Sequence, residues 1–188
     1  ECEDLLAAAG GAGAGPVELL TAAGEGLGGT EVEPSLLARF SALGSGTRAI
    51  GVWKRRWAER PVAPCVYLRG VADPGNVGAV VRTALALVGG SVALGPDCAD
   101  PFGIRAVRAS MGAVFAEPLV QAPIEATPGP RGALVAHGGD ALEALEGAAT
   151  ICLGAEREGL PDEVLASCDV RVTIPILEGA ESLNVAAA

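Results

Sequence analysis

The stretch "RGVADPGNVGAVVRTA", which runs from Arg69 to Ala84, combines residue types that can position an anionic ligand. Its "DPGN" sequence is typical of a turn, and Asn76 is placed to cap the helix that follows. Arg82 comes in the second turn of this helix, close enough to the loop to reach a ligand bound there. The glycines do not form the G-x-G-x-x-G fingerprint of a dinucleotide site. The pattern is consistent with an arginine that reaches a ligand held by the loop. The alternative is a helix cap followed by a surface arginine.

A second polar turn occurs in "ICLGAEREGLPDE". Gly154 and Ala155 are small, so the backbone can approach a ligand closely at this point. Glu156 follows directly, and its carboxylate has the right charge to hold Arg82 in a defined orientation. The segment therefore predicts a close backbone contact next to an acidic group.

A third turn, in "VTIPILEGAESLNVAAA", places Ser182 and Asn184 on either side of Leu183. A hydroxyl and an amide beside an apolar side chain can hold a small ligand between hydrogen bonds and an apolar wall. Taken alone, "ESLN" is equally consistent with a simple helix cap.

Basic residues gather locally although the formal net charge is −10. Arg105 and Arg108 lie about one turn apart in a predicted helix. With Arg82 they form a positive surface for phosphate if the two helices are adjacent. Taken singly, each of these arginines is an ordinary solvated side chain.

A second basic group stands between two tryptophans, in the sequence "WKRRW". Basic residues interleaved with aromatic rings suit contacts to the RNA backbone and base stacking. A solvated charge run with tryptophans packed at a domain edge is the alternative. The candidate RNA-binding residues of this run are Lys54, Arg55 and Arg56.

The rest of the composition counts against several kinds of site. His137 is the only histidine, so a Ser-His-Asp or Cys-His group or a multi-histidine metal centre would depend on one residue. The five cysteines are scattered and never spaced as C-x-x-C, which disfavours a disulfide framework and a zinc site. No uninterrupted apolar run reaches about 18 residues, and the N-terminus lacks a basic region followed by an apolar one. We expect no metal, no membrane contact and a cytoplasmic location.

From Cys65 onward, short apolar segments alternate with helical patterns. The predicted strands are "CVYLRGV", "SVALG", "ALVAHG", "ATICLGA" and "VRVTIPI". The predicted helices run from Asn76 to about Val88 and over "IRAVRASMG" and "ALEAL". This alternation indicates an α/β fold with a parallel sheet covered on both faces. Ligands of such sheets bind at the carboxyl ends of the strands, so the three polar turns should meet at one rim.

Residues 1–60 are predicted to form a separate small α/β unit. Helices are expected at "EDLLAAA", "PVELLTAAG" and "EPSLLARFSAL", and a strand at "RAIGVW". The segment "AERPVAP" interrupts the pattern with two prolines. We therefore expect a domain boundary there, with domains at residues 1–60 and 64–188.

The three turns together resemble the motifs of the SpoU (TrmH-type) branch of the SPOUT RNA methyltransferases. "DPGNVGAVVRTA" is similar to the first family motif, "LGAEREGL" to the second and "IPILEGAESLNVAAA" to the third, in the same order and with similar spacing. The resemblance covers roughly residues 64–188. Residues 1–60 more weakly resemble the small ribosomal-protein-like RNA-binding domain that many members carry.

The resemblance implies a SPOUT-type α/β knot, in which the C-terminal part of a mostly parallel sheet is threaded into a trefoil knot. S-adenosylmethionine would bind in this knot. Members are homodimers whose active site is completed across the interface. They continue past the third motif into a longer C-terminal helix, whereas this sequence ends at Ala188. By motif, the residues around the methyl donor are Leu153, Gly154, Ile174 and Leu183.

The implied reaction is methyl transfer to a ribose 2′-hydroxyl of RNA, ribosomal rather than transfer RNA because of the extra N-terminal domain. Arg82 would clamp the target phosphate and stabilise developing alkoxide charge, since a guanidinium stays protonated in proteins. The alternatives are a transfer RNA 2′-O-methyltransferase, a catalytically weak SPOUT-fold RNA-binding protein, and a Rossmann-type dinucleotide enzyme. The residues expected to orient Arg82 and the ribose are Asn76, Glu156, Ser182 and Asn184.

Overall fold

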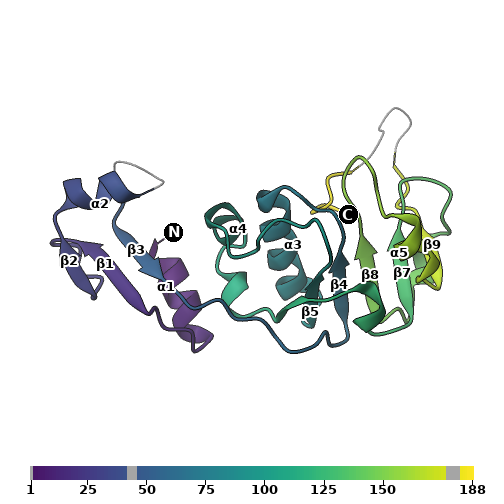
Figure 1. The fold of residues 1–188 in the computed structure, drawn as a ribbon, viewed down its shortest axis with the longest axis horizontal. Helices are drawn as coiled ribbons and strands as arrows, with labels where there is room; N and C mark the ends of the chain where they lie inside the picture. The colour runs from purple at the N-terminus through teal and green to yellow at the C-terminus, as the bar shows by residue number, and fades with distance from the viewer. Residues whose placement is uncertain (1, 42–45, 177–182) are drawn as a thin grey trace. The chain divides into compact units, whose positions relative to one another are not determined.

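The computed structural model describes residues 2–41, 46–176 and 183–188. The chain divides into two compact units, Glu1–Arg55 and Arg56–Ala188. The first unit is built on a three-stranded sheet with the order β2-β1-β3 (Figure 1). β1 pairs in parallel with β2 and antiparallel with β3. Its elements are α1 (Cys2–Gly11), β1 (Glu18–Ala22), β2 (Thr30–Val32), α2 (Pro34–Phe40) and β3 (Ala49–Val52).

The helix predicted for "PVELLTAAG" is wrong, because this segment forms β1, the central strand of the first sheet. Pro16 and Gly24, whose φ is +85°, bound a segment too short for a stable isolated helix. β1 also has a strand on either side, so both edges of its backbone find hydrogen-bond partners. The other predicted elements of this unit, α1, α2 and β3, are confirmed.

The second unit contains a six-stranded sheet in the order β6-β5-β4-β8-β7-β9, in which every neighbouring pair is parallel. The predicted α/β fold with a mostly parallel sheet is confirmed. The strands are β4 (Cys65–Leu68), β5 (Ser91–Leu94), β6 (Leu119–Gln121), β7 (Arg131–Leu134), β8 (Thr150–Leu153) and β9 (Val170–Val172). The helices are α3 (Pro74–Leu87), α4 (Ile104–Ala109) and α5 (Asp162–Ala166), with short 3₁₀ turns η1 (Ala113–Phe115), η2 (Ile124–Ala126) and η3 (Leu142–Leu145).

Two short elements of this unit differ from the prediction. "ALEAL" forms the 3₁₀ turn η3 rather than an α-helix. It is confined between Asp140, which bridges to β9, and Gly147, whose φ is +81°. These two neighbours limit the length of any helix at this place. The three-residue strand β6 was not predicted, because its sequence is too short for a periodic pattern to emerge.

Two apolar clusters cover the two faces of the six-stranded sheet. On one face the buried side of α3 packs on β4 and β5 through Val77, Val80, Val81 and Ala84. On the other face Val164 of α5 packs with Tyr67, Ala133 and Cys152. β4 and β5 are buried along their whole length, which explains their continuous apolar sequences.

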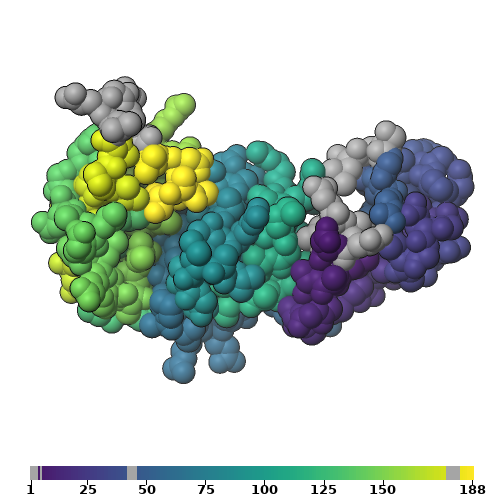
Figure 2. All heavy atoms as spheres, turned by 180° about the vertical axis from the view of Figure 1, so that it is seen from behind, coloured from purple at the N-terminus to yellow at the C-terminus, as the bar shows by residue number. Residues whose placement is uncertain are grey.

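The strand order reverses direction next to β4. From β4 the chain moves outward to β5 and β6, then crosses to β7 on the other side and returns through β8. The carboxyl ends of strands at such a switch point are where open parallel sheets bind ligands. The last described segment, 183–188, lies on the surface of this unit in yellow in Figure 2, and its Val185 joins the cluster beneath α3.

Candidate functional site

Three polar side chains from distant parts of the sequence form one hydrogen-bonded cluster. The Asn76 and Asn184 side-chain amides both donate to Glu156 Oε1, each at 2.9 Å. Asn184 Nδ2 also donates to Asn76 Oδ1 at 3.1 Å. Asn76 lies in the first turn of α3, Glu156 in the loop after β8 and Asn184 in the C-terminal segment. The three predicted motifs therefore meet at one point.

The N-cap of α3 lies three residues earlier than predicted. Asp73, not Asn76, is the N-cap residue, and its Oδ1 accepts the Asn76 backbone N–H at 3.1 Å. Pro74 follows as the first helical residue, a position that suits its fixed φ and missing N–H. Because Asp73 performs the capping, the Asn76 side chain is free to face Glu156.

The predicted pairing of Glu156 with Arg82 does not occur among the described residues. Glu156 is occupied by the two asparagine amides. Asn76 and Arg82 are six residues apart on α3, about 240° around the helix axis, so they do not share a face. Arg82 is exposed, and no described residue bonds to its guanidinium. Its charge is thus open to solvent beside the cluster.

The three arginines predicted to form a positive surface lie on helices that pack against each other. Gly78 of α3 contacts the Ala106 carbonyl and Ala109 of α4 so closely that a Cβ could not be accommodated. Both arginines of α4 are exposed, as is Arg82. Arg105 forms a 3.2 Å ion pair with Asp73, which offsets part of its charge. Arg108 and Arg82 make the larger contribution to the positive potential.

A pocket of about 440 Å³ opens at the carboxyl ends of β7, β8 and β9. It is lined by residues 134–138, 153–160 and the C-terminal segment, together with Arg171, Ile174 and Ile176. The four residues predicted from the motifs to contact the methyl donor, Leu153, Gly154, Ile174 and Leu183, all line it. Ser182, the remaining predicted site residue, lies outside the described residues.

The loop after β8 forms a tight turn that is closed by backbone hydrogen bonds. Ala155 and Gly159 exchange backbone hydrogen bonds at 3.2 and 2.9 Å, and Gly159 has a φ of +69°. A Cβ on Gly154 would overlap the Gly159 carbonyl group and the Leu160 nitrogen. Only glycine allows this crossing, which places Glu156 at the turn between the pocket and the asparagines.

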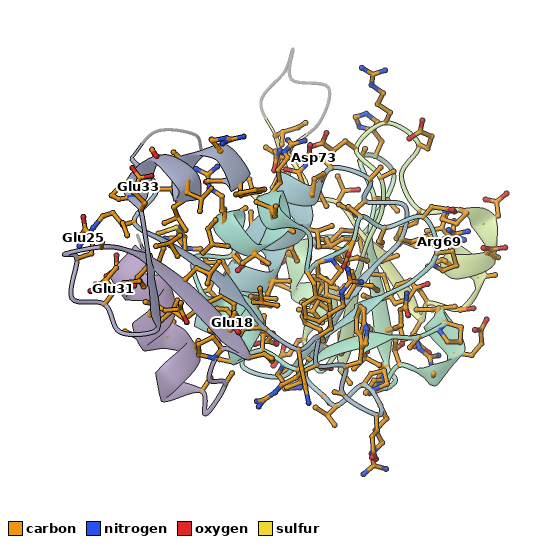
Figure 3. The ribbon with its side chains drawn as sticks, turned by 60° about the vertical axis from the view of Figure 1, so that its left-hand side comes forward. Glu18, Glu25, Glu31, Glu33, Arg69 and Asp73 are labelled. Atoms are coloured by element: carbon orange, nitrogen blue, oxygen red, sulfur yellow. The ribbon has the colours of Figure 1, made fainter. Side chains whose placement is uncertain are left out.

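Arg69, at the carboxyl end of β4, was not predicted as a site residue. Its guanidinium donates to the Pro96 carbonyl at 2.9 Å and forms ion pairs with Asp97 at 2.6 Å and Glu163 at 3.1 Å. These partners, first Asp97 and then Glu163, hold the pKa of Arg69 above its ordinary value. Figure 3 shows Arg69 beside α5. The residue ties the loop after β5 to α5 at the rim of the sheet.

His137 and Leu160 also line the pocket without having been assigned a role there from the sequence. The sequence feature that could have identified them is their position, because each follows the carboxyl end of a strand, where ligands of parallel sheets bind. In the described part of the chain, no group of three or more His, Cys, Asp or Glu side chains is arranged to hold a metal ion. No helix there has the length and apolar character needed to cross a membrane.

The two tryptophans flanking the basic run have separate partners. The indole N–H of Trp53 donates to the Ala14 carbonyl within the first unit at 3.0 Å. Trp57 packs edge-on against Phe102 in the second unit, with ring centroids 4.9 Å apart, and remains 37% exposed. Lys54, Arg55 and Arg56 between them are exposed.

Known proteins share both the sequence motifs and this fold. An uncharacterised tRNA/rRNA methyltransferase from Mycobacterium tuberculosis is 38% identical over 135 residues, which cover 64% of this chain and 47% of that protein. The chain thus spans about half the length of the curated relatives it matches.

Several solved structures match nearly the whole chain, including two RNA methyltransferases. The AdoMet-bound rRNA methyltransferase from Sinorhizobium meliloti has a TM-score of 0.77 and 25% identity, covering 97% of this chain and 80% of that one. An RNA 2′-O ribose methyltransferase has a TM-score of 0.76 and 25% identity, covering 98% and 81%. The model of the SpoU rRNA Methylase family matches residues 63–188. The chain belongs to this family.

Proposed function

We propose that this protein is an S-adenosylmethionine-dependent methyltransferase acting on a ribose 2′-hydroxyl of RNA. The observation that carries the proposal is the Asn76–Glu156–Asn184 cluster at the edge of a pocket lined by the four predicted donor-contact residues. Membership of the family and the AdoMet-bound neighbour from Sinorhizobium meliloti support it.

The pocket has the size and chemistry expected of a donor site. A volume of about 440 Å³ falls in the usual range for small-molecule pockets. Leu153, Ile174 and Leu183 offer apolar walls, and the Gly154 backbone is unobstructed by a side chain. When bound, S-adenosylmethionine supplies an electrophilic methyl group on its sulfonium sulfur. The residues of this chain would hold that ligand and exclude water from it.

The hydrogen-bonded cluster would position the acceptor ribose. Glu156 is fixed by two amide donors, so its carboxylate keeps one orientation. Ser182 is proposed to contribute a hydroxyl to the same group. Holding the 2′-hydroxyl in line with the methyl group lowers the entropic part of the barrier.

Arg82 would act on the phosphate and on the developing charge. A guanidinium is too basic to remove the hydroxyl proton, so we assign that proton to the phosphate or to water. Arg82 remains cationic and stabilises the alkoxide as it forms. Its exposure on α3, beside the exposed arginines of α4, is consistent with an approach of RNA from this side.

The C-terminal segment supports a knotted arrangement of the family type. Asn184 contacts the loop after β8, and Val185 packs into the cluster beneath α3. We propose that the segment reaches these places through a trefoil knot and that two chains pair so that each completes the other's active site. Because the proposed substrate is RNA, we also propose that the protein acts in the cytoplasm.

Ribosomal RNA is the proposed substrate class, and transfer RNA is the alternative. The rRNA methyltransferase neighbour matches 97% of the chain, so the likeness includes the first unit. We propose that residues 1–60, which comprise this unit and the start of the next, bind RNA with Lys54, Arg55 and Arg56, and that residues 64–188 carry out methyl transfer.

The test is transfer of a labelled methyl group from S-adenosylmethionine to purified ribosomal and transfer RNAs. Digestion of the product to nucleosides should yield a 2′-O-methyl nucleoside from ribosomal RNA, and Glu156→Ala should abolish it. A labelled base instead of a labelled ribose would overturn the 2′-hydroxyl assignment. Donor and RNA binding without turnover would support the catalytically weak alternative.

A further inference from the structure

Two cysteines lie in contact directly behind the pocket. The Cys152 and Cys168 sulfur atoms are 3.7 Å apart, although the residues are 16 positions apart in sequence. Cys152 is completely buried in β8, whereas Cys168 is half-buried in the turn between α5 and β9. In the described part of the chain this is the only hydrogen-bonded pair of thiols. Cys168 is thus the more exposed of the two residues.

The charges around the pair distinguish the two thiols. The Cys168 pKa is lowered, first by the hydrogen bond between the Cys168 and Cys152 sulfur atoms and further because Arg131 lies nearby, whereas partial burial raises it. The Arg131 guanidinium contacts the Ser167 carbonyl at 3.5 Å, next to Cys168. Asp169 opposes this effect, and Arg171 adds to it. The hydrogen bond to Cys168 and burial raise the pKa of Cys152. Cys168 is also the less buried of the two residues, so it is the expected attacking thiol.

A metal site does not account for this arrangement. No third His, Cys, Asp or Glu of the described residues joins the pair as a metal-binding group. A partly exposed thiol in contact with a second, buried thiol is an arrangement found in redox-active cysteine pairs.

We propose that Cys152 and Cys168 form a peroxide-sensitive dithiol that closes to a disulfide. The Cys168 thiolate sulfur attacks one oxygen of hydrogen peroxide, the O–O bond breaks, and hydroxide leaves and takes up a proton as water. The Cys152 sulfur then gives up its proton and attacks the Cys168 sulfenic acid, forming the S–S bond and releasing a second water. The two thiols lose two electrons, and the peroxide is reduced to two molecules of water.

Closure of this bond should alter the pocket. A disulfide bond is about 2.05 Å long, so the sulfur atoms must approach each other. β8 is held on both sides by β4 and β7, so the movement falls on α5 and the turn after it. Leu165, in α5, lines the pocket. Oxidation therefore draws a pocket wall toward β8 and lowers affinity for the methyl donor. This consequence rests on the proposed function.

The disulfide itself is tested by mapping thiols in the full chain carrying Cys2→Ser. After treatment with hydrogen peroxide, non-reducing digestion should yield a peptide that links Cys152 to Cys168, and reduction should separate it. Cys168→Ser should eliminate the link, and the matched variant Cys98→Ser should retain it. In Cys152→Ala, a sulfenic acid on Cys168 should be trapped by dimedone. Oxidation at other cysteines first, or no link in folded protein, overturns the proposal.

The coupling to the pocket is tested by titrating S-adenosylmethionine into reduced, oxidised and re-reduced protein. We expect the affinity for S-adenosylmethionine to fall by about fivefold or more on oxidation and to recover on reduction. A fivefold change is at the lower end of the usual range of coupling between two sites. Unchanged affinity in fully linked protein contradicts the coupling. If reduced protein fails to bind the donor, the proposed function fails, while the peptide map still decides the dithiol.

Discussion

The carboxylate of Glu156 accepts two amide hydrogen bonds at a single oxygen, Oε1. Both donors are neutral, so the cluster keeps its negative charge while its geometry is fixed. Arg82, in contrast, keeps its positive charge exposed to solvent. At the scale of single residues, the structure thus fixes the Glu156 carboxylate by hydrogen bonds and leaves the Arg82 side chain exposed, as the proposed orienting and charge-stabilising roles require.

Arg82→Ala should reduce methyl transfer by about a hundredfold or more, the usual effect of removing one group that stabilises transition-state charge. Donor affinity should stay unchanged, because Arg82 does not line the pocket. The measurement is single-turnover transfer together with calorimetric donor binding. Arg108→Ala, which removes an exposed arginine of the adjacent helix, is the control and should have a smaller effect. Turnover close to wild type in Arg82→Ala would refute the assigned role.

Glu117 adds a pH dependence to stability. It is only 5% exposed, and its Oε1 has no hydrogen-bond partner among the residues that the structure describes. Burial raises the pKa of this carboxyl from 4.5 to about 7. The folded state therefore holds a proton that the unfolded chain releases. Its contribution to stability is fully present below pH 4.5 and is lost as the pH rises through about 7.

Glu117→Gln should remove the pH-dependent contribution of Glu117 to the free energy of unfolding, which is at most on the order of 3 kcal/mol. The measurement is urea unfolding of wild type and variant between pH 4.5 and 8, where the variant should lose less stability as the pH rises. The exposed Glu125→Gln serves as the control and should follow wild type. Parallel pH profiles of wild type and Glu117→Gln would show that Glu117 does not hold the extra proton.

At the scale of elements, the contact between α3 and α4 decides where the arginines lie. Gly78→Ala should destabilise the protein by about 1–3 kcal/mol, although alanine favours helices, because its Cβ would overlap the Ala106 carbonyl. Thr83→Ala, at an exposed position of the same helix, should change stability by less than about 0.5 kcal/mol. Chemical denaturation measures both. Equal stability of the two variants would mean that α3 and α4 accommodate the added Cβ with no loss of stability, which would contradict the close packing at Gly78.

The elements that the sequence predicts correctly are those with strong periodicity. Val77, Val80, Val81 and Ala84 recur at helical spacing, and α3 buries this face. The buried strands β4 and β5 are short apolar runs bounded by turns. β1 escapes prediction because its residues also suit a helix, and only the pairing with two other strands decides its conformation.

Site prediction depended on two different kinds of information. Local pattern located the turns, and the expected parallel sheet indicated that they meet at one rim, as Asn76, Glu156 and Asn184 do. The family resemblance indicated which residues surround the methyl donor. The pairing of Glu156 with Arg82 was wrong, because helical phase separates residues 76 and 82. Arg69 was missed because its ion-pair partners, Asp97 and Glu163, lie far away in sequence and show no pattern around it.

At the scale of the whole molecule, charge is distributed unevenly. The formal net charge is −10, and Glu18, Glu25, Glu31 and Glu33 lie exposed on the first unit (Figure 3). Such a surface repels RNA over most of its area, so phosphate contacts must be confined to a few basic positions.

Replacing Lys54, Arg55 and Arg56 together by Glu should weaken RNA binding at least tenfold and reduce its salt dependence, because fewer counterions are released. Donor affinity should not change. Filter binding across a salt series measures the RNA affinity. Arg39→Glu replaces an exposed arginine of α2 and is the control, and the loss of RNA affinity for each replaced charge is compared between the two variants. An equal loss per charge in Arg39→Glu would indicate a general charge effect instead of a local RNA contact.

The central claim is that the pocket at the ends of β7, β8 and β9 binds S-adenosylmethionine. Calorimetric titration of the purified, folded chain with this donor, with NAD titrated in parallel, tests it most directly. We predict saturable binding of one donor per chain, competed by S-adenosylhomocysteine, and no binding of NAD. Folded protein that binds NAD, or that binds neither ligand, would contradict the account.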